Sequence, residues 1–535
     1  MNRWTDHLII APVLLPLLAG AVMLIFGSEG RRNFNAAVNV ASSFTLVVVA
    51  IALLRATDAG PVGVTTVYRL GDWPAPFGIV LVADRLSALM LLLTSLVAVA
   101  ALVFSLARWH RAGSHFHSLF QFLLMGLNGA FLTGDLFNLF VFFELLLAAS
   151  YGLALHGSGS FRVKAGLHYV VVNLAASLLF LIGVSLIYSI AGTLNMADLA
   201  TRIREIRAED RALLEMGTGI LGMAFLLKAG MWPLCFWLPT TYAAASPPVA
   251  SIFAILTKVG VYIVLRLWLL LFGDEAGASA QFGREWLLLG GIATVAFGII
   301  GTLASQDMAR LAAFSVLVSS GTVLAAIGMG QVSVTGGALY YLISSTLGVS
   351  AFFLLVELVE RGREPGADVF AVTREAYGDD DASDEEEVGI VIPATMGMLG
   401  LAFIGCALVI AGLPPLSGFI AKFALLTAAL SASGSSPGAP LPIASWTLLV
   451  LLILSGLAAL IAMTRAGIRA FWASPDRVVP RVRLIEIGPV VVLLLLCAIQ
   501  TVQAGPVMRF MEAAAQSLHA PHNYVRGVLG QKQGG

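Results

Sequence analysis

The chain has 535 residues, of which 59% are hydrophobic and only 12% are charged, and its mean hydropathy is +0.91. A soluble protein needs far more polar surface, so the composition predicts one large membrane bundle, an all-α polytopic membrane protein. The formal net charge is zero, which gives no indication of nucleic acid as a partner.

The three cysteines, Cys235, Cys406 and Cys497, lie inside apolar segments, and the chain has no Cys-x-x-Cys motif. The pair His115-x-His117 has no third ligand candidate close by. A disulfide framework, a zinc site and an iron–sulfur cluster are therefore not expected. The sequence also lacks a Walker A motif and a dinucleotide-binding glycine motif, so we expect neither a cofactor nor nucleotide hydrolysis.

The membrane-spanning helices follow from the apolar runs, because about 20 apolar residues cross a bilayer. The first run, from Leu8 to Phe26, is longer than the core of a cleaved signal peptide. Runs of this kind predict about fourteen spans. Their approximate positions are 7–27, 35–54, 79–107, 116–134, 135–156, 165–191, 213–238, 246–271, 285–303, 308–328, 335–359, 390–431, 444–464 and 486–506.

Three connections between these spans have their own character. Residues 55–78 end in a proline-rich turn with aromatic side chains suited to a membrane interface. Residues 195–212 have the charge spacing of a short amphipathic helix at the surface. Residues 361–388 end in an acidic run that predicts a solvated, disordered loop.

The spans group into four predicted parts. Residues 1–107 hold the first three helices, 116–271 a first repeat of five, 285–464 a second repeat of five that includes the acidic loop, and 486–535 the last helix with a C-terminal tail. A helix broken by proline recurs about five spans later. An odd number of spans between two copies turns the second copy upside down, which is the inverted-repeat pattern of transporters.

Lys and Arg in short loops predict the orientation, because such loops stay cytoplasmic. These residues share one side of the bundle, which is therefore expected to be cytoplasmic, so both termini are expected on the outer side. The basic stretch at 195–212 lies on the outer side and is a counterexample. The residues on the expected cytoplasmic side are Arg31, Arg32, Arg108, Arg111, Arg162, Lys164, Arg465, Arg469, Arg477, Arg481 and Arg483.

Four charged residues lie near the middle of apolar spans: Glu144, Lys228, Lys258 and Lys422. One such charge costs roughly 3 kcal/mol at the bilayer centre, and four left unpaired would cost about 10 kcal/mol or more. One interpretation is a set of structural ion pairs that hold helices together. The other, which we favour, is a path for protons through the membrane.

Prolines accompany two of these lysines. Pro233 follows Lys228 and predicts a kink at or just after the lysine, while Pro414 and Pro415 precede Lys422 and predict a break in the twelfth span. Irregular backbone inside a membrane is tolerated only where it lines an enclosed cavity. Burial disfavours the charged form of a lysine and a nearby carboxylate favours it, so Glu144 could switch the protonation of Lys228.

Four segments together resemble a known family: Phe142-Phe-Glu-Leu145, Leu227 to Pro239, Ser246 to Tyr262, and Gly412 to Lys422. They are similar to the antiporter-like subunits shared by respiratory complex I and the multisubunit Mrp-type cation/proton antiporters. The resemblance implies fourteen helices, two inverted five-helix repeats with broken helices in spans seven and twelve, and a proton path of one glutamate and successive lysines. Carried over residue by residue, this path is Glu144, Lys228, Lys258 and Lys422.

The sequence departs from this family in two places. Many relatives carry a histidine where this chain has Cys235, and many carry a histidine and a lysine in span eleven. The hydroxyls of Ser344, Ser345 and Thr346 are the candidates to connect Lys258 with Lys422 here.

Two further segments, 71–90 and 464–472, resemble the D subunits of Mrp-type antiporters. They favour a proton-translocating subunit of a monovalent cation/proton antiporter, with Na+ as the expected cation. The implied partners are the lipid bilayer and several smaller membrane subunits, and the implied location is the bacterial inner membrane. The alternatives are a proton-pumping subunit of NADH:quinone oxidoreductase or of a membrane-bound hydrogenase, and a scaffold that transports nothing.

Overall fold

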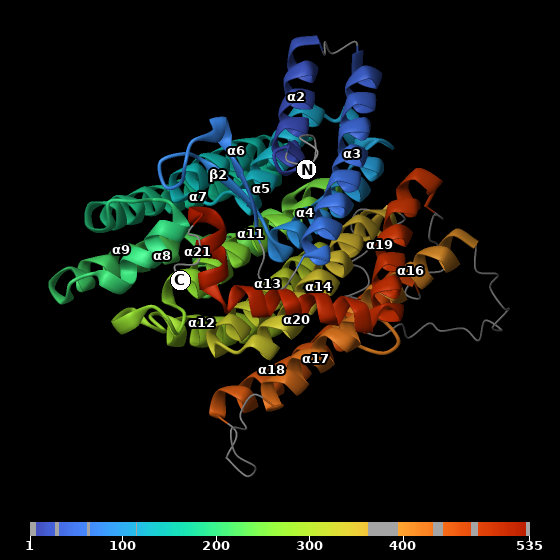
Figure 1. The fold of residues 1–535 in the computed structure, drawn as a ribbon. Helices are drawn as coiled ribbons and strands as arrows, with labels where there is room; N and C mark the ends of the chain where they lie inside the picture. The colour runs from blue at the N-terminus through green and yellow to red at the C-terminus, as the bar shows by residue number, and fades with distance from the viewer. Residues whose placement is uncertain are drawn as a thin grey trace, which may run out of the picture.

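A computed structural model describes residues 7–26, 31–60, 65–113, 115–361, 394–431, 442–471 and 480–530. The chain is almost entirely helical and wraps into one bundle (Figure 1). Its α-helices are α2 Ala11–Phe26, α3 Arg32–Ala59, α4 Arg85–Ser105, α5 Phe116–Leu132, α6 Leu136–Ala154, α7 Ser160–Ala191, α8 Met196–Glu205, α9 Ala208–Ala229, α10 Leu238–Ala244, α11 Pro247–Phe272, α12 Arg284–Ala304, α13 Met308–Met329, α14 Val332–Glu360, α16 Ala394–Ala411, α17 Ser417–Ser431, α18 Ile443–Phe471, α19 Leu484–Val502, α20 Ala504–Leu518 and α21 Pro521–Leu529.

Among these, 12 helical segments are long and apolar enough to cross a membrane, and α2, α5 and α17 are shorter apolar helices. Each of the predicted spans corresponds to one helix or to a broken pair of helices. The all-α polytopic class is therefore confirmed, and the chain is a multi-pass membrane protein. The acidic loop expected at 361–388 lies outside the described residues, apart from Arg361.

One end of the bundle is capped by elements that do not cross it. The strands β1 Thr66–Arg69 and β2 Val80–Ala83 form an antiparallel hairpin, a departure from a purely helical chain. The exposed Trp73 and Phe77 lie in its connection, as expected for the interface. The predicted surface helix is present as α8, and its apolar side is buried.

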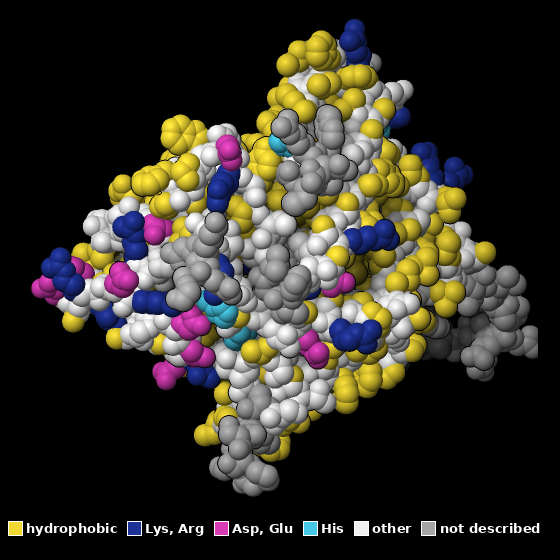
Figure 2. Space-filling model, in the orientation of Figure 1, with side chains coloured by type: hydrophobic (Ala, Val, Ile, Leu, Met, Phe, Trp, Pro, Cys, Tyr) yellow, Lys and Arg dark blue, Asp and Glu magenta, His cyan; other side chains and the backbone are white. Residues whose placement is uncertain are grey.

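The C-terminal tail forms two amphipathic helices at this same end. Helix α20 lies across α14, and α21 packs on α8 (Figure 1). Figure 2 shows charged side chains gathered over α8 and α21, whereas hydrophobic side chains cover α2 and α3. Charged side chains at one end and hydrophobic side chains on the flank are typical of a membrane protein whose end contacts water and whose flank contacts lipid.

Two helix pairs pack in the same way, which supports the predicted repeat. On α5, a Cβ at Gly129 would lie 2.2 Å from Phe142 of α6, and on α12 a Cβ at Gly301 would lie 2.1 Å from Phe314 of α13. Asp135 caps α6 and Asp307 caps α13. The same close approach and the same cap therefore recur at one constant offset along the chain. The inverted relation of the two copies stays a prediction.

Candidate functional site

Glu144 on α6 and Lys228 on α9 lie near each other, where α6 contacts α9 through Phe143. The ammonium of Lys228 is 4.9 Å from the centre of the Phe143 ring, and it lies within electrostatic range of Glu144. Glu144 Oε1 and Lys228 Nζ are both buried without a hydrogen bond. Among the described residues no ion pair within 4.0 Å joins the two side chains, so this conformation does not contain the fixed ion pair.

The chain breaks its helix just after Lys228. Helix α9 ends at Ala229, and Gly230 follows in the left-handed conformation with φ of 72°. A glycine is the usual residue at this position because it carries no Cβ. The kink predicted from Pro233 is therefore present, but the glycine ends the helix and the proline only follows it. Lys228 occupies the last turn of α9, where a cation is favoured by the helix dipole.

Lys258 lies on α11 and is almost completely enclosed, with 1% of its surface exposed. Its ammonium donates hydrogen bonds to two hydroxyls of α13, Ser319 Oγ at 2.7 Å and Ser320 Oγ at 3.2 Å. Helices α9 and α11 pack closely beside it, because a Cβ at Gly260 would lie 2.6 Å from the Ala229 nitrogen. The second lysine is thus held by neutral groups and not by a carboxylate.

Lys422 lies on α17, beyond the second helix break. Helix α16 ends at Ala411, and Gly412 follows with φ of 76°, so the break predicted at Pro414 and Pro415 is present. The Lys422 ammonium donates to the free carbonyl of Ala411 at 3.0 Å and to Ser455 Oγ of α18 at 3.3 Å. The negative end of α16 therefore stabilises this cation.

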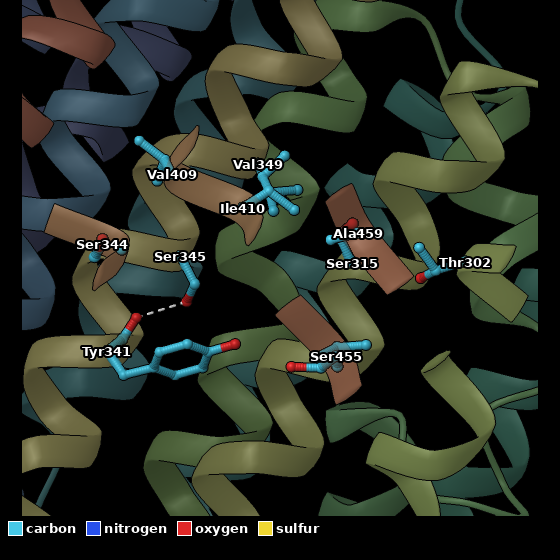
Figure 3. A pocket seen from close by; sticks show the side chains of 12 residues that line it. Thr302, Ser315, Tyr341, Ser344, Ser345, Val349, Val409, Ile410, Ser455 and Ala459 are labelled. Atoms are coloured by element: carbon cyan, nitrogen blue, oxygen red, sulfur yellow. Dashed lines mark hydrogen bonds between the residues drawn. The ribbon is translucent and has the colours of Figure 1, made fainter. Parts of the chain in front are cut away.

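A small pocket of about 20 Å³ lies between the last two lysines, among α12, α13, α14, α16, α17 and α18. Figure 3 shows hydroxyl groups and apolar side chains facing each other around it. The polar side chains of its wall are Thr302, Ser315, Tyr341, Ser344, Ser345 and Ser455.

The three predicted hydroxyls have different surroundings. Ser345 lines the pocket and bonds Ser319 at 2.7 Å. Ser344 also lines it and bonds Ser417 of α17 at 2.7 Å. Thr346 does not line it, and its hydroxyl donates to the Leu342 carbonyl of its own helix at 2.6 Å. The structure therefore brings Ser344 and Ser345 to the site and leaves Thr346 outside it.

Sequence reasoning missed Ser319, Ser320 and Ser455, the three hydroxyls that bond the lysines. A signal for the first was present: Ser315, Ser319 and Thr322 repeat at helical spacing in an otherwise apolar span. No comparable signal marks Ser455.

Comparison with known proteins identifies the family of the chain. Residues 133–436 match the family model described as "NADH:quinone oxidoreductase/Mrp antiporter, TM". The chain belongs to this family.

Two relatives that match over their full length indicate which branch of the family the chain resembles. The chain is 61% identical to the D subunit of a probable K(+)/H(+) antiporter from Rhizobium meliloti (strain 1021), covering 100% of both chains. It is 33% identical to the D subunit of a Na(+)/H(+) antiporter from Alkalihalophilus pseudofirmus, covering 98% of this chain and 99% of the relative. Both relatives are transporter subunits by name, and neither is named as an enzyme.

Solved structures show the same fold. A chain of the Mrp complex from Dietzia sp. DQ12-45-1b matches with a TM-score of 0.81 at 25% identity, covering 99% of this chain and 100% of that one. A chain of respiratory complex I from Thermus thermophilus matches with a TM-score of 0.74 at 22% identity, covering 96% and 99%. The second likeness concerns the fold alone.

Proposed function

We propose that this chain is the D subunit of a multisubunit monovalent cation/proton antiporter and moves protons along Glu144, Lys228, Lys258 and Lys422. The observation that carries the proposal is the open Glu144–Lys228 pair, in which Glu144 Oε1 and Lys228 Nζ are buried without hydrogen bonds beside a helix break. Buried charges without partners are expensive in a membrane and mark ion pathways. Full-length similarity to the D subunits of antiporters supports this function over a redox pump.

The exchanged cation is a separate part of the proposal. The sequence alone led us to expect Na+, and the relative at 33% identity is named for Na+. The relative at 61% identity is named for K+, and this much greater similarity leads us to propose K+ instead. We further propose that the chain lies in the bacterial inner membrane with both termini outside, in a complex with smaller membrane subunits.

Antiport in vesicles that contain the assembled complex tests both parts. We expect Glu144→Ala and Lys228→Ala each to lower antiport by more than about tenfold, with K+ supporting faster exchange than Na+ or Li+. Lys164→Ala, at an exposed lysine, is the matched control and should leave the rate unchanged. The proton-path proposal fails if both variants assemble and exchange cations at the wild-type rate.

A further inference from the structure

Among the described residues, no His, Lys, Asp or Glu lines the pocket between Lys258 and Lys422, yet hydrogen bonds lead toward it from both lysines. From Lys258 the bonds run to Ser319 and then to Ser345, at 2.7 Å each. From Lys422 one bond of 3.3 Å reaches Ser455. Ser345 and Ser455 both line the same pocket, so the two short chains end at a shared space.

That space can hold a water molecule. Its volume is about 20 Å³, and a polar cavity needs about 10–15 Å³ and two to four polar partners to hold a water. Ser345, Ser455, Ser315 and Tyr341 face it (Figure 3). The remainder of the wall, which includes Val349 and Ile410, is mostly apolar.

We infer that Ser319, Ser345 and Ser455, with water in the pocket between them, form a hydroxyl bridge that carries protons from Lys258 to Lys422. This inference rests on the proposed function, because it supplies one step of that proton path. A hydroxyl suits the role because it donates one hydrogen and accepts on two lone pairs.

The step balances without any further reactant. An Nζ–H bond of charged Lys258 breaks and a new Nζ–H bond forms on neutral Lys422. Each oxygen between them accepts a proton from the preceding group and releases its own to the next, so each keeps its number of protons. The O–H bonds then point backward and must turn before the next proton passes.

The structure provides the resting position for that turn. Ser345 Oγ lies 2.7 Å from the Tyr341 carbonyl, the bond drawn in Figure 3, and Ser455 Oγ lies 2.7 Å from the Leu452 carbonyl. Each hydroxyl can donate to its own helix at rest and turn into the pocket to pass a proton. At rest the two hydroxyls are therefore bonded to their own helices and pass no proton. Rotation of both hydroxyls into the pocket connects the path.

The test compares a Thr variant with a Val variant at each position, because these two side chains have the same shape. Ser345→Thr keeps the hydroxyl. Ser345→Val has a methyl group in its place, and this methyl group fills the space that an additional water molecule could otherwise occupy. In vesicles with the assembled complex we expect the Val variant to exchange at least about tenfold more slowly than the Thr variant. The same difference is expected between Ser455→Val and Ser455→Thr.

Thr346→Val is the control on the same helix, because it removes a buried hydroxyl that does not line the pocket. It should leave antiport unchanged. Equal rates for Ser345→Val and Ser345→Thr, with Glu144→Ala inactive, would overturn the bridge but leave the proposed function standing. Wild-type rates in Glu144→Ala and Lys228→Ala would instead remove the proposed function itself.

Discussion

Glu144 and Lys228 interact electrostatically, yet no hydrogen bond joins them, and Glu144 Oε1 and Lys228 Nζ are buried without a hydrogen-bond partner. The pair is therefore open in this conformation. A small movement of α6 or of the broken end of α9 would close it and favour the charged form of the lysine. Reopening would release the proton, so one pair could exist in two states with different proton affinity.

Replacing Lys228 with Met tests whether this lysine contributes to function and not to stability. Its ammonium has no hydrogen bond to lose, and a buried ammonium without a hydrogen-bond partner is itself costly. We expect an apolar side chain of similar length to lower the free energy of unfolding by less than about 1.5 kcal/mol while antiport is lost. Thermal unfolding of the purified complex measures the first quantity.

Lys422→Met is the informative contrast. This substitution leaves the Ala411 carbonyl and Ser455 without their donor, and an unsatisfied buried polar group costs about 1–3 kcal/mol. Lys422→Met should therefore destabilise the chain more than Lys228→Met. Equal losses of stability would show that Lys228 has a structural partner after all.

The buried ion pair between Asp84 and Arg266 is expected to be structural. It joins the start of α4 to α11, with both side chains 8% exposed, and a second bond runs from Nη2 to Oδ1 at 2.7 Å. Breaking such a pair on one side costs about 3–5 kcal/mol, so Asp84→Asn should lower the unfolding temperature markedly. Glu209→Ala breaks the exposed pair with Arg207 and should have no measurable effect.

Gly412 is expected to fix the position of Lys422. Its φ is 76°, and a Cβ there would lie 2.6 Å from Lys422 Cδ. Gly412→Ala should therefore cost about 1–2 kcal/mol for the left-handed backbone and also displace the lysine, lowering antiport. Gly400→Ala is the control on the neighbouring helix α16, since a Cβ there meets nothing within 4 Å. Similar antiport in the two variants would show that Lys422 tolerates displacement.

The positions of the helices and of their breaks could be predicted from the sequence because apolar runs and prolines are local signals. The caps Asp135 and Asp307 are local in the same sense, since a cap acts within one turn of its helix. The hairpin of β1 and β2 was missed because its strands are 4 residues each and lie within or beside a segment rich in turn residues.

The members of the hydroxyl bridge could be predicted only in part, because they depend on which helix faces meet. A serine in an apolar helix usually bonds its own backbone, as Thr346 does, and the sequence does not distinguish it from Ser345. Ser319 and Ser455 acquire a role only because α13 and α18 pack beside the two lysines.

His519 is expected to make attachment of the C-terminal helices sensitive to pH. It lies between α20 and α21, 3.0 Å from Thr335 Oγ1 of α14. Burial lowers the pKa of His519 below its ordinary value of 6.5, although Asp274 opposes the shift. The bound state therefore favours neutral histidine, and its stabilising contribution is present above about pH 6.5 and lost as the pH falls below it.

Hydrogen exchange of the α20 and α21 amides in the purified complex measures this attachment. We expect faster exchange at about pH 5.5 than at about pH 7.5, after correction for the intrinsic pH dependence of exchange. His519→Gln, which cannot take up a proton, should remove this difference. His522→Gln is the matched control, because His522 is exposed and its pairing with Glu275 at 3.5 Å is at the surface. A pH difference that persists in His519→Gln and disappears in His522→Gln would assign the sensitivity to the surface histidine instead.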